Sequence, residues 1–114
     1  MIAAAAPDLA APLNRLVLTA QLLERGAVRY TPAGLPAIDL VLRHESTAFE
    51  DDQPRKVSLE IRALAIGAVS RPVGALELGG AGDFAGFLAS QRNGRGVLFH
   101  VTSLAPVASP IAPI

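Results

Sequence analysis

The sequence predicts an all-β fold, a small barrel of five strands within a single domain. Apolar residues recur at every second position in five separate segments, which is the pattern of strands that bury one face. Glycines and prolines separate those segments, and no stretch carries a long helical period. The chain has 114 residues, of which 51% are hydrophobic, so one core can form without metals or crosslinks.

The first strand is predicted over residues 14–22, followed by a loop. One face of this strand carries Leu16, Leu18, Ala20 and Leu22. Residues 26–36 contain two prolines and two glycines, which disfavour both a helix and a hydrogen-bonded strand. We therefore expect an exposed hairpin loop there.

The second and third strands are predicted over residues 38–43 and 56–66. In the second strand, Ile38, Leu40 and Leu42 alternate with more polar residues. The third strand has the clearest alternation, with one face formed by Val57, Leu59, Ile61 and Ala63. Residues 44–54 between these strands are acidic and are expected to form a loop.

The remaining two strands are predicted over residues 84–89 and 97–104. Before them, residues 67–82 break the pattern with Pro72 and several glycines, leaving room for at most one short helical turn, over residues 75–78. Gly86 predicts a bend or bulge within the fourth strand. Asn93-Gly94 predicts a tight hairpin turn, because both residues tolerate positive φ.

Five strands without a long helix indicate a small barrel or sandwich. The length of the third strand favours a barrel, since a long curved strand can contribute to both sides. Five-stranded Greek-key closure is the OB architecture, whose ligands lie over strands 2 and 3 and between the loops joining strands 1–2 and 4–5. Periodicity alone leaves an SH3-like barrel as an alternative.

Composition excludes several classes of function. Ten Lys and Arg residues balance ten Asp and Glu residues, so any phosphate binding must be local and modest. The chain has no cysteine, which removes disulfides and thiolate chemistry. His44 and His100 lack partners at metal-ligand spacing, and no serine-nucleophile signature occurs. We expect no enzyme activity, no metal and no cofactor.

The ends of the chain predict flexible extensions around one OB-fold domain, with boundaries at 1–13, 14–107 and 108–114. The first residues lack the basic leading segment of a secretory signal, and the last contain several prolines. No apolar run is long enough to cross a bilayer. We therefore expect a cytoplasmic protein with no membrane partner.

Several short segments resemble a known family in order and spacing. They are the runs 14–18, 34–36, 41–44, 92–94 and 97–100. Over residues 14–107 the chain is similar to the primosomal replication protein N (PriB) family. The resemblance implies a non-enzymatic, nucleoid-associated homodimer of OB folds that binds single-stranded DNA and bridges the PriA helicase to later loading factors in the replication-restart primosome. A general single-stranded DNA-binding protein would share much of this pattern and is an alternative.

The resemblance also implies a DNA surface with basic and aromatic side chains. Arg55 falls on a basic position of the family, and Arg92 and Arg95 retain part of its basic tip between strands 4 and 5. Two aromatic positions are lost, one aligning near Gln53 and a tryptophan aligning with Ser58. Because base stacking contributes about 1–3 kcal/mol per base, we expect weaker DNA binding than the family norm.

Five further residues complete the candidate DNA surface. Lys56 and Arg62 lie on the outer face of the third strand, and Arg29 and Tyr30 lie in the first loop. Lys56 and Arg62 could equally belong to an ordinary solvated sheet face, and the Arg-Lys pair at 55–56 could pair with the acidic loop. Tyr30 would more often pack on its own hairpin. Phe49 is either a cap on the core or free to stack, and we favour the cap. The alternative function is an OB-fold protein-interaction adaptor with little DNA binding.

Overall fold

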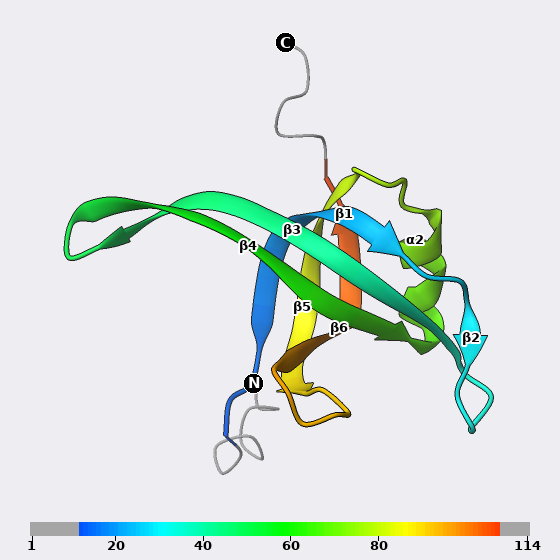
Figure 1. The fold of residues 1–114 in the computed structure, drawn as a ribbon. Coiled ribbons are helices and arrows are strands. Elements are labelled where there is room, and N and C mark those ends of the chain that lie inside the picture. The colour runs from blue at the N-terminus through cyan, green and yellow to red at the C-terminus, as the bar shows by residue number, and fades with distance from the viewer. Residues whose placement is uncertain (1–11, 108–114) are drawn as a thin grey trace, which may run out of the picture.

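The computed structural model describes residues 12–107 and confirms the all-β class (Figure 1). Of the expected flexible extensions, 1–13 and 108–114, all but residues 12 and 13 lie outside the described residues. In chain order the elements are β1 (Leu16–Arg25), β2 (Arg29–Tyr30), β3 (Pro36–Glu50), β4 (Gln53–Ile66), the 3₁₀ turn η1 (Gly67–Val69), α2 (Ser70–Ala75), β5 (Ala81–Ser90) and β6 (Val97–Pro106).

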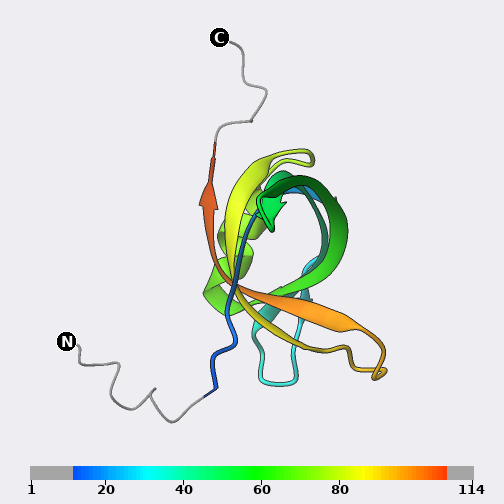
Figure 2. The same cartoon turned by 90° about the vertical axis from the view of Figure 1, so that its left-hand side faces the viewer.

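Five of these strands close a barrel of the predicted OB type. The strands are hydrogen-bonded in the order β1-β5-β6-β4-β3, and an additional β1–β3 pairing joins the two ends. β4 and β6 run parallel, whereas the other pairs are antiparallel. Viewed after a 90° turn, the curled strands surround the core (Figure 2).

The core contains many of the residues that the alternation placed on inner faces, but not Val57 and Leu59, which lie on the part of β4 that extends beyond the barrel. The largest fully buried side chains are Phe84, Phe99, Leu22, Ile38, Leu42 and Val73. All but Val73 come from strands, and Val73 comes from α2, which packs against β3 and β4. Among the described residues, every buried side-chain nitrogen and oxygen has a hydrogen-bond partner.

The helical segment lies earlier in the chain than predicted. We expected a turn over residues 75–78, but η1 and α2 occupy residues 67–75 and the chain is extended at Leu76. Pro72 stands in the first turn of α2, where its missing N–H needs no intrahelical partner. None of the helices described within residues 12–107 is long and apolar enough to cross a membrane.

The loop predicted over residues 26–36 contains a short strand. Arg29 pairs with Ala37 and Tyr30 pairs with Pro36, so β2 extends the sheet beyond β3. Pro36 is tolerated because it begins β3, where an amide donor is not required. The hairpin turn between β2 and β3 uses Gly34 at a φ of 87°.

The loop predicted over residues 44–54 is wrong, because β3 and β4 continue there as a two-stranded ribbon. We call residues 44–59 the ribbon; their pairing runs from His44 opposite Leu59 to Glu50 opposite Gln53. It projects well beyond the barrel in Figure 1. Asp51 and Asp52 have φ values of 51° and 63°. Positive φ at both central residues is the geometry of a type I′ hairpin turn.

The β5–β6 hairpin contains the bulge that Gly86 predicted. Ala85 pairs with Ser103 and Gly86 pairs with Val101, which leaves Thr102 of β6 as the extra residue. The hairpin predicted at Asn93-Gly94 is confirmed, although only Gly94 of the pair has positive φ. The Asn93 side chain accepts a hydrogen bond from the Arg95 backbone at 2.8 Å.

Candidate nucleic-acid interface

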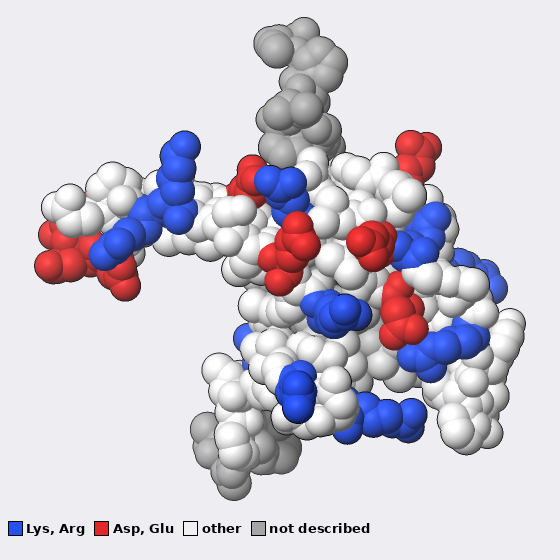
Figure 3. Space-filling model, viewed as in Figure 1, with Lys and Arg blue, Asp and Glu red and all other residues white. Residues whose placement is uncertain are grey.

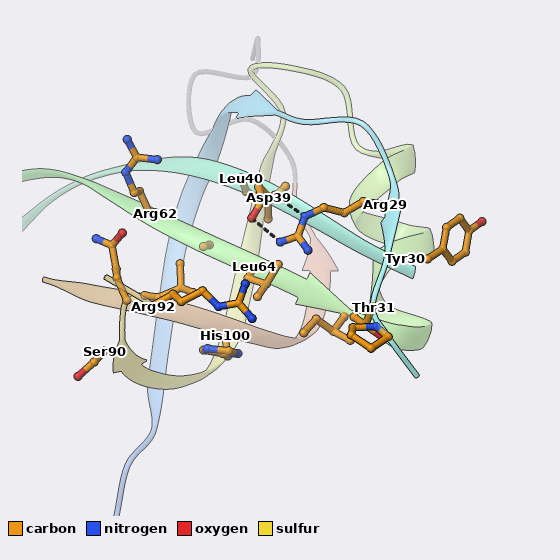
Figure 4. A pocket seen from close by; sticks show the side chains of 15 residues that line it. Arg29, Tyr30, Thr31, Asp39, Leu40, Arg62, Leu64, Ser90, Arg92 and His100 are labelled. Atoms are coloured by element: carbon orange, nitrogen blue, oxygen red, sulfur yellow. Dashed lines mark hydrogen bonds and ion pairs between the residues drawn. The ribbon is translucent and has the colours of Figure 1, made fainter. Parts of the chain in front are cut away.

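A hollow of about 660 Å³ lies on the outer side of the barrel. Its walls come from β2, β3, β4, β6 and the β5–β6 loop, and four predicted site residues line it: Arg29, Tyr30, Arg62 and Arg92 (Figure 4). We refer to this feature as the hollow. It occupies the place where OB folds bind their ligands, over the second and third barrel strands and between two loops.

Register explains why side chains from four strands meet in this region. Phe87 of β5 pairs with His100 of β6, and His100 pairs with Leu64 of β4. Leu64 in turn pairs with Asp39 of β3. Directly paired residues project to the same face of a sheet. The four side chains therefore form a row across the outer face, and the hollow includes three of them, from His100 to Asp39.

Arg29 forms one wall of the hollow through an ion pair. Its Nε lies 2.9 Å from Asp39 Oδ2 and its Nη2 lies 3.1 Å from Asp39 Oδ1. The hydrogen bond and the charge of Asp39 both raise the pKa of Arg29. The guanidinium thus holds β2 against β3, and its charge is compensated locally.

Arg62 and Arg92 supply the free positive charge of the hollow. Both are exposed, and neither has an Asp or Glu oxygen within 4.0 Å among residues 12–107. In Figure 4 the Arg92 side chain extends below Leu64 towards His100. Figure 3 shows basic side chains without acidic neighbours over the β5–β6 loop. The chain has no net charge, yet this region is locally basic.

The aromatic candidates are both exposed. Tyr30 is 70% exposed, and in Figure 4 its ring points away from the hollow. Phe49 is 73% exposed near the end of the ribbon. The expectation that Phe49 caps the core is therefore wrong, because the ribbon carries it away from the barrel.

The other basic candidates lie outside the hollow. Arg55 lies on the ribbon and pairs with Glu50 at 2.9 Å, rather than with the acidic turn residues. Lys56 lies on the same strand beside a shallow depression lined by Thr47 and Ser58. Arg95 is exposed at the β5–β6 tip and does not line the hollow.

Both histidines have partners within the fold. The Nδ1 of His44 donates to the Thr19 carbonyl at 2.7 Å, because that oxygen can only accept, and its Nε2 is hydrogen-bonded to the Ser46 hydroxyl at 2.7 Å. His100 stacks on Phe87, with ring centroids 4.8 Å apart. Within residues 12–107, no group of three or more His, Asp or Glu side chains is placed to hold a metal ion.

Sequence reasoning did not identify that His100, Leu64 and Phe87 lie side by side on the outer face of the barrel. The alternation in β5 and β6 could have placed Phe87 and His100 on outer faces, since Phe84 and Phe99 are inside. What it could not supply is the cross-strand register that brings them together.

Comparison with known proteins gives consistent matches. Residues 14–103 match the profile described as another single-strand binding protein family. The replication restart protein PriB of Bordetella pertussis is 46% identical over 80 residues, covering 70% of this chain and 75% of that protein. PriB of Neisseria meningitidis serogroup B is 47% identical over 55 residues, covering 47% and 55%.

Solved structures agree with these sequence matches. PriB from Ralstonia solanacearum superposes with a TM-score of 0.78 at 35% identity, covering 83% of this chain and 98% of that chain. The single-stranded DNA binding protein from Thermus aquaticus superposes with a TM-score of 0.67 at 28% identity, covering 86% of this chain and 52% of that chain.

Proposed function

The chain belongs to the single-strand binding protein family and to the replication restart proteins PriB, and on this basis we propose that it binds single-stranded DNA during replication restart. The DNA lies in the hollow, where no chemical reaction is required of the protein. Binding uses side chains alone, without a cofactor or metal. The PriB names of the curated relatives favour this role over that of a general single-stranded DNA-binding protein.

The observation that carries the proposal is the pair of unpaired arginines in the hollow. Arg92 extends from the β5–β6 loop into the hollow, and Arg62 borders it from β4 with its guanidinium directed away from Arg92 (Figure 4). Single-strand binding surfaces combine such positive grooves with faces on which bases stack. Arginine also binds phosphate in a bidentate manner.

We propose that the affinity is lower than is usual in the family. Three arginines have carboxylate partners at 2.9 Å or less: Arg29, Arg43 and Arg55. Their charges are compensated before any phosphate arrives, and counterion release depends on uncompensated cations. The exposed Ser58 offers no stacking surface on β4.

The family resemblance supports two partners besides DNA: the PriA helicase, with later primosome loading factors, and a second copy of the chain. The pairing of β1 supports a homodimer. Residues 16–18 pair with β5 on one side, and no described strand pairs with them on the other. An open strand edge is a template for pairing, and Val17 beside it is 55% exposed. A cytoplasmic location follows from a role at the replication fork.

An OB-fold adaptor with little DNA binding is the second candidate function. The ribbon favours it, because Arg55 is paired with Glu50 and the exposed Phe49 offers an apolar anchor to a protein. Retention of the helicase in a pull-down, with no measurable binding of an oligonucleotide, would select this function.

The test is a titration of fluorescein-labelled oligo(dT) by anisotropy at several salt concentrations. We expect Arg62→Ala and Arg92→Ala each to weaken binding and to reduce the salt slope by about 0.7 per lost phosphate contact. Arg62→Ala combined with Arg92→Ala should weaken binding more than either substitution alone.

Arg71→Ala is the matched control, because Arg71 is an exposed arginine on α2 that does not line the hollow. It should bind oligo(dT) like the unmodified protein. Equal weakening by Arg71→Ala and Arg92→Ala would mean that charge in general, rather than the hollow, attracts the DNA.

A further inference from the structure

We propose that Asn93, at the tip of the β5–β6 loop, is a site of spontaneous deamidation. The attacking group is the backbone nitrogen of Gly94, and the reaction converts the side-chain amide of Asn93 to a carboxylate. The modified residue lies between Arg92 and Arg95. Its effect on DNA rests on the proposed single-stranded DNA binding, whereas the modification itself does not.

The turn that carries Asn93 is open to solvent. Residues 92–97 are all exposed. The Gly94 N–H donates to the Gln91 carbonyl at 2.8 Å, and this local hydrogen bond must open before the nitrogen can attack. A β-carbon built on Gly94 would have no heavy atom within 4 Å, so open space surrounds the attacking residue. An exposed turn closed by local hydrogen bonds opens at small cost in free energy.

The side-chain carbonyl of Asn93 is held in a polarised state. Its Oδ1 accepts a hydrogen bond from the Arg95 backbone N–H at 2.8 Å. When a nucleophile adds to Cγ, negative charge develops on this same oxygen, and a donor already aimed at it stabilises that charge. Within residues 12–107 neither Arg92 nor Arg95 has a carboxylate partner, so both flanking cations add to the stabilisation.

The reaction needs water as its co-reactant. The Gly94 nitrogen loses its proton to solvent and forms a bond to Cγ of Asn93. The bond from Cγ to Nδ2 breaks, and Nδ2 takes up a proton from solvent and leaves as ammonia. Water then opens the resulting succinimide ring at one of its two carbonyl carbons, which gives aspartate or isoaspartate at position 93.

Asn14 is an internal control, because it is the other asparagine of the chain. Its Nδ2 donates to the Leu88 carbonyl at 2.7 Å, and its Oδ1 accepts from the Leu88 N–H at 2.9 Å. Both polar atoms of this amide are therefore fixed on β5. The next residue is Arg15, whose side chain hinders the approach of its own backbone nitrogen. We expect Asn14 to stay unmodified.

A carboxylate at position 93 changes the charge next to the hollow. Arg92 lines the hollow, and position 93 directly follows it. The new charge compensates the neighbouring arginines, as Glu50 compensates Arg55 at 2.9 Å. Because counterion release depends on uncompensated cations, deamidation would weaken the binding of single-stranded DNA.

The modification is tested by incubating the full chain at pH 8 for several days, followed by mass spectrometry of its proteolytic peptides. We expect the peptide that contains Asn93 to gain the mass difference between an amide and a carboxylic acid, with isoaspartate among the products. The peptide that contains Asn14 should keep its mass. No conversion at Asn93 in the folded protein, or equal conversion at Asn14, would overturn the inference. Conversion at Asn93 in the urea-unfolded chain alone would show that the turn protects it.

The effect on DNA is measured with Asn93→Asp, whose carboxylate can still accept the Arg95 N–H. We expect oligo(dT) affinity to fall about two- to five-fold, with a salt slope smaller by about 0.7. Asn93→Ser is the matched control, because a hydroxyl can accept the same hydrogen bond but cannot deamidate. It should bind like the unmodified protein and keep its affinity after incubation. Unchanged affinity of Asn93→Asp would contradict the effect on DNA.

The outcomes separate this inference from the proposed function. If the unmodified protein does not bind oligo(dT), the proposed function fails, while conversion at Asn93 would still establish the modification site. If the protein binds oligo(dT) and the arginine substitutions weaken that binding, but Asn93 does not convert, only the modification site is wrong.

Discussion

Gly86 shows how a single residue fixes the geometry of the candidate site. A β-carbon at this position would lie 1.8 Å from the carbonyl oxygen and 2.9 Å from the carbonyl carbon of His100. Neither backbone atom can move without parting β5 from β6. The sequence predicted a bend or bulge from a glycine inside a strand, but the atom that excludes a side chain depends on the register and could not be predicted.

We expect Gly86→Ala to lower the free energy of unfolding by about 1–3 kcal/mol or more, because overpacking against backbone cannot be relieved by a rotamer change. Gly74→Ala is the matched control. A β-carbon on Gly74 would make an ordinary 3.6 Å contact with Ile38, and alanine is favoured over glycine in a helix. Urea unfolding of both variants measures the difference. Equal stability of the two would contradict the close approach.

The orientation of individual aromatic side chains could not be predicted from the sequence. The sequence identifies Phe49 and Tyr30 as aromatic residues between apolar strands, yet it does not give the direction in which a ring points. Phe49 was expected on the core and is 73% exposed. The position of a side chain outside the alternating segments follows from the path of the backbone, which periodicity does not describe.

The ribbon is the element that periodicity could not reveal. Apolar alternation reports burial on one face, and residues 45–50 and 53–56 are exposed on both faces. The strands are nevertheless paired throughout, because each supplies the other's backbone hydrogen bonds. Within the barrel, where one face is buried, four of the predicted strands lie inside the observed β3, β4, β5 and β6, and the first begins two residues before β1 and ends three residues before its end.

The turn of the ribbon gives a prediction at the scale of the element. Asp52 has a φ of 63°, which glycine adopts without strain and which is unfavourable for a β-branched residue. Asp52→Gly should preserve the ribbon, and Asp52→Val should fray it. NMR contacts between the α-protons of facing residues near the pair Ala48 and Arg55 measure the pairing. Intact contacts in the valine variant would show that the turn does not determine the ribbon.

Over the whole molecule, the distribution of charge matters more for DNA binding than the net charge does. The net charge is zero, and the three ion pairs of the described chain compensate Arg29, Arg43 and Arg55. Arg62 and Arg92 remain uncompensated around one hollow. The sequence predicted both as candidates, but it could not predict that both line one hollow, because β4 and the β5–β6 loop come together only through barrel closure.

The barrel itself could be predicted from the sequence because a closed sheet needs one apolar face per strand, and residues such as Leu22, Leu42 and Phe99 supply it. The ribbon, the short β2 strand and the row from Phe87 to Asp39 could not. Each of them depends on which segments pair with one another. The sequence of a segment does not show which other segment it pairs with.

An NMR titration of the isotope-labelled protein with unlabelled oligo(dT) would show directly whether single-stranded DNA lies in the hollow. If single-stranded DNA lies in the hollow, the largest amide shift changes will fall on residues 62–64, 90–92 and 98–100, with little change in α2. Shift changes centred on α2 or on the free edge of β1, with residues 62–64 and 98–100 unaffected, would contradict it.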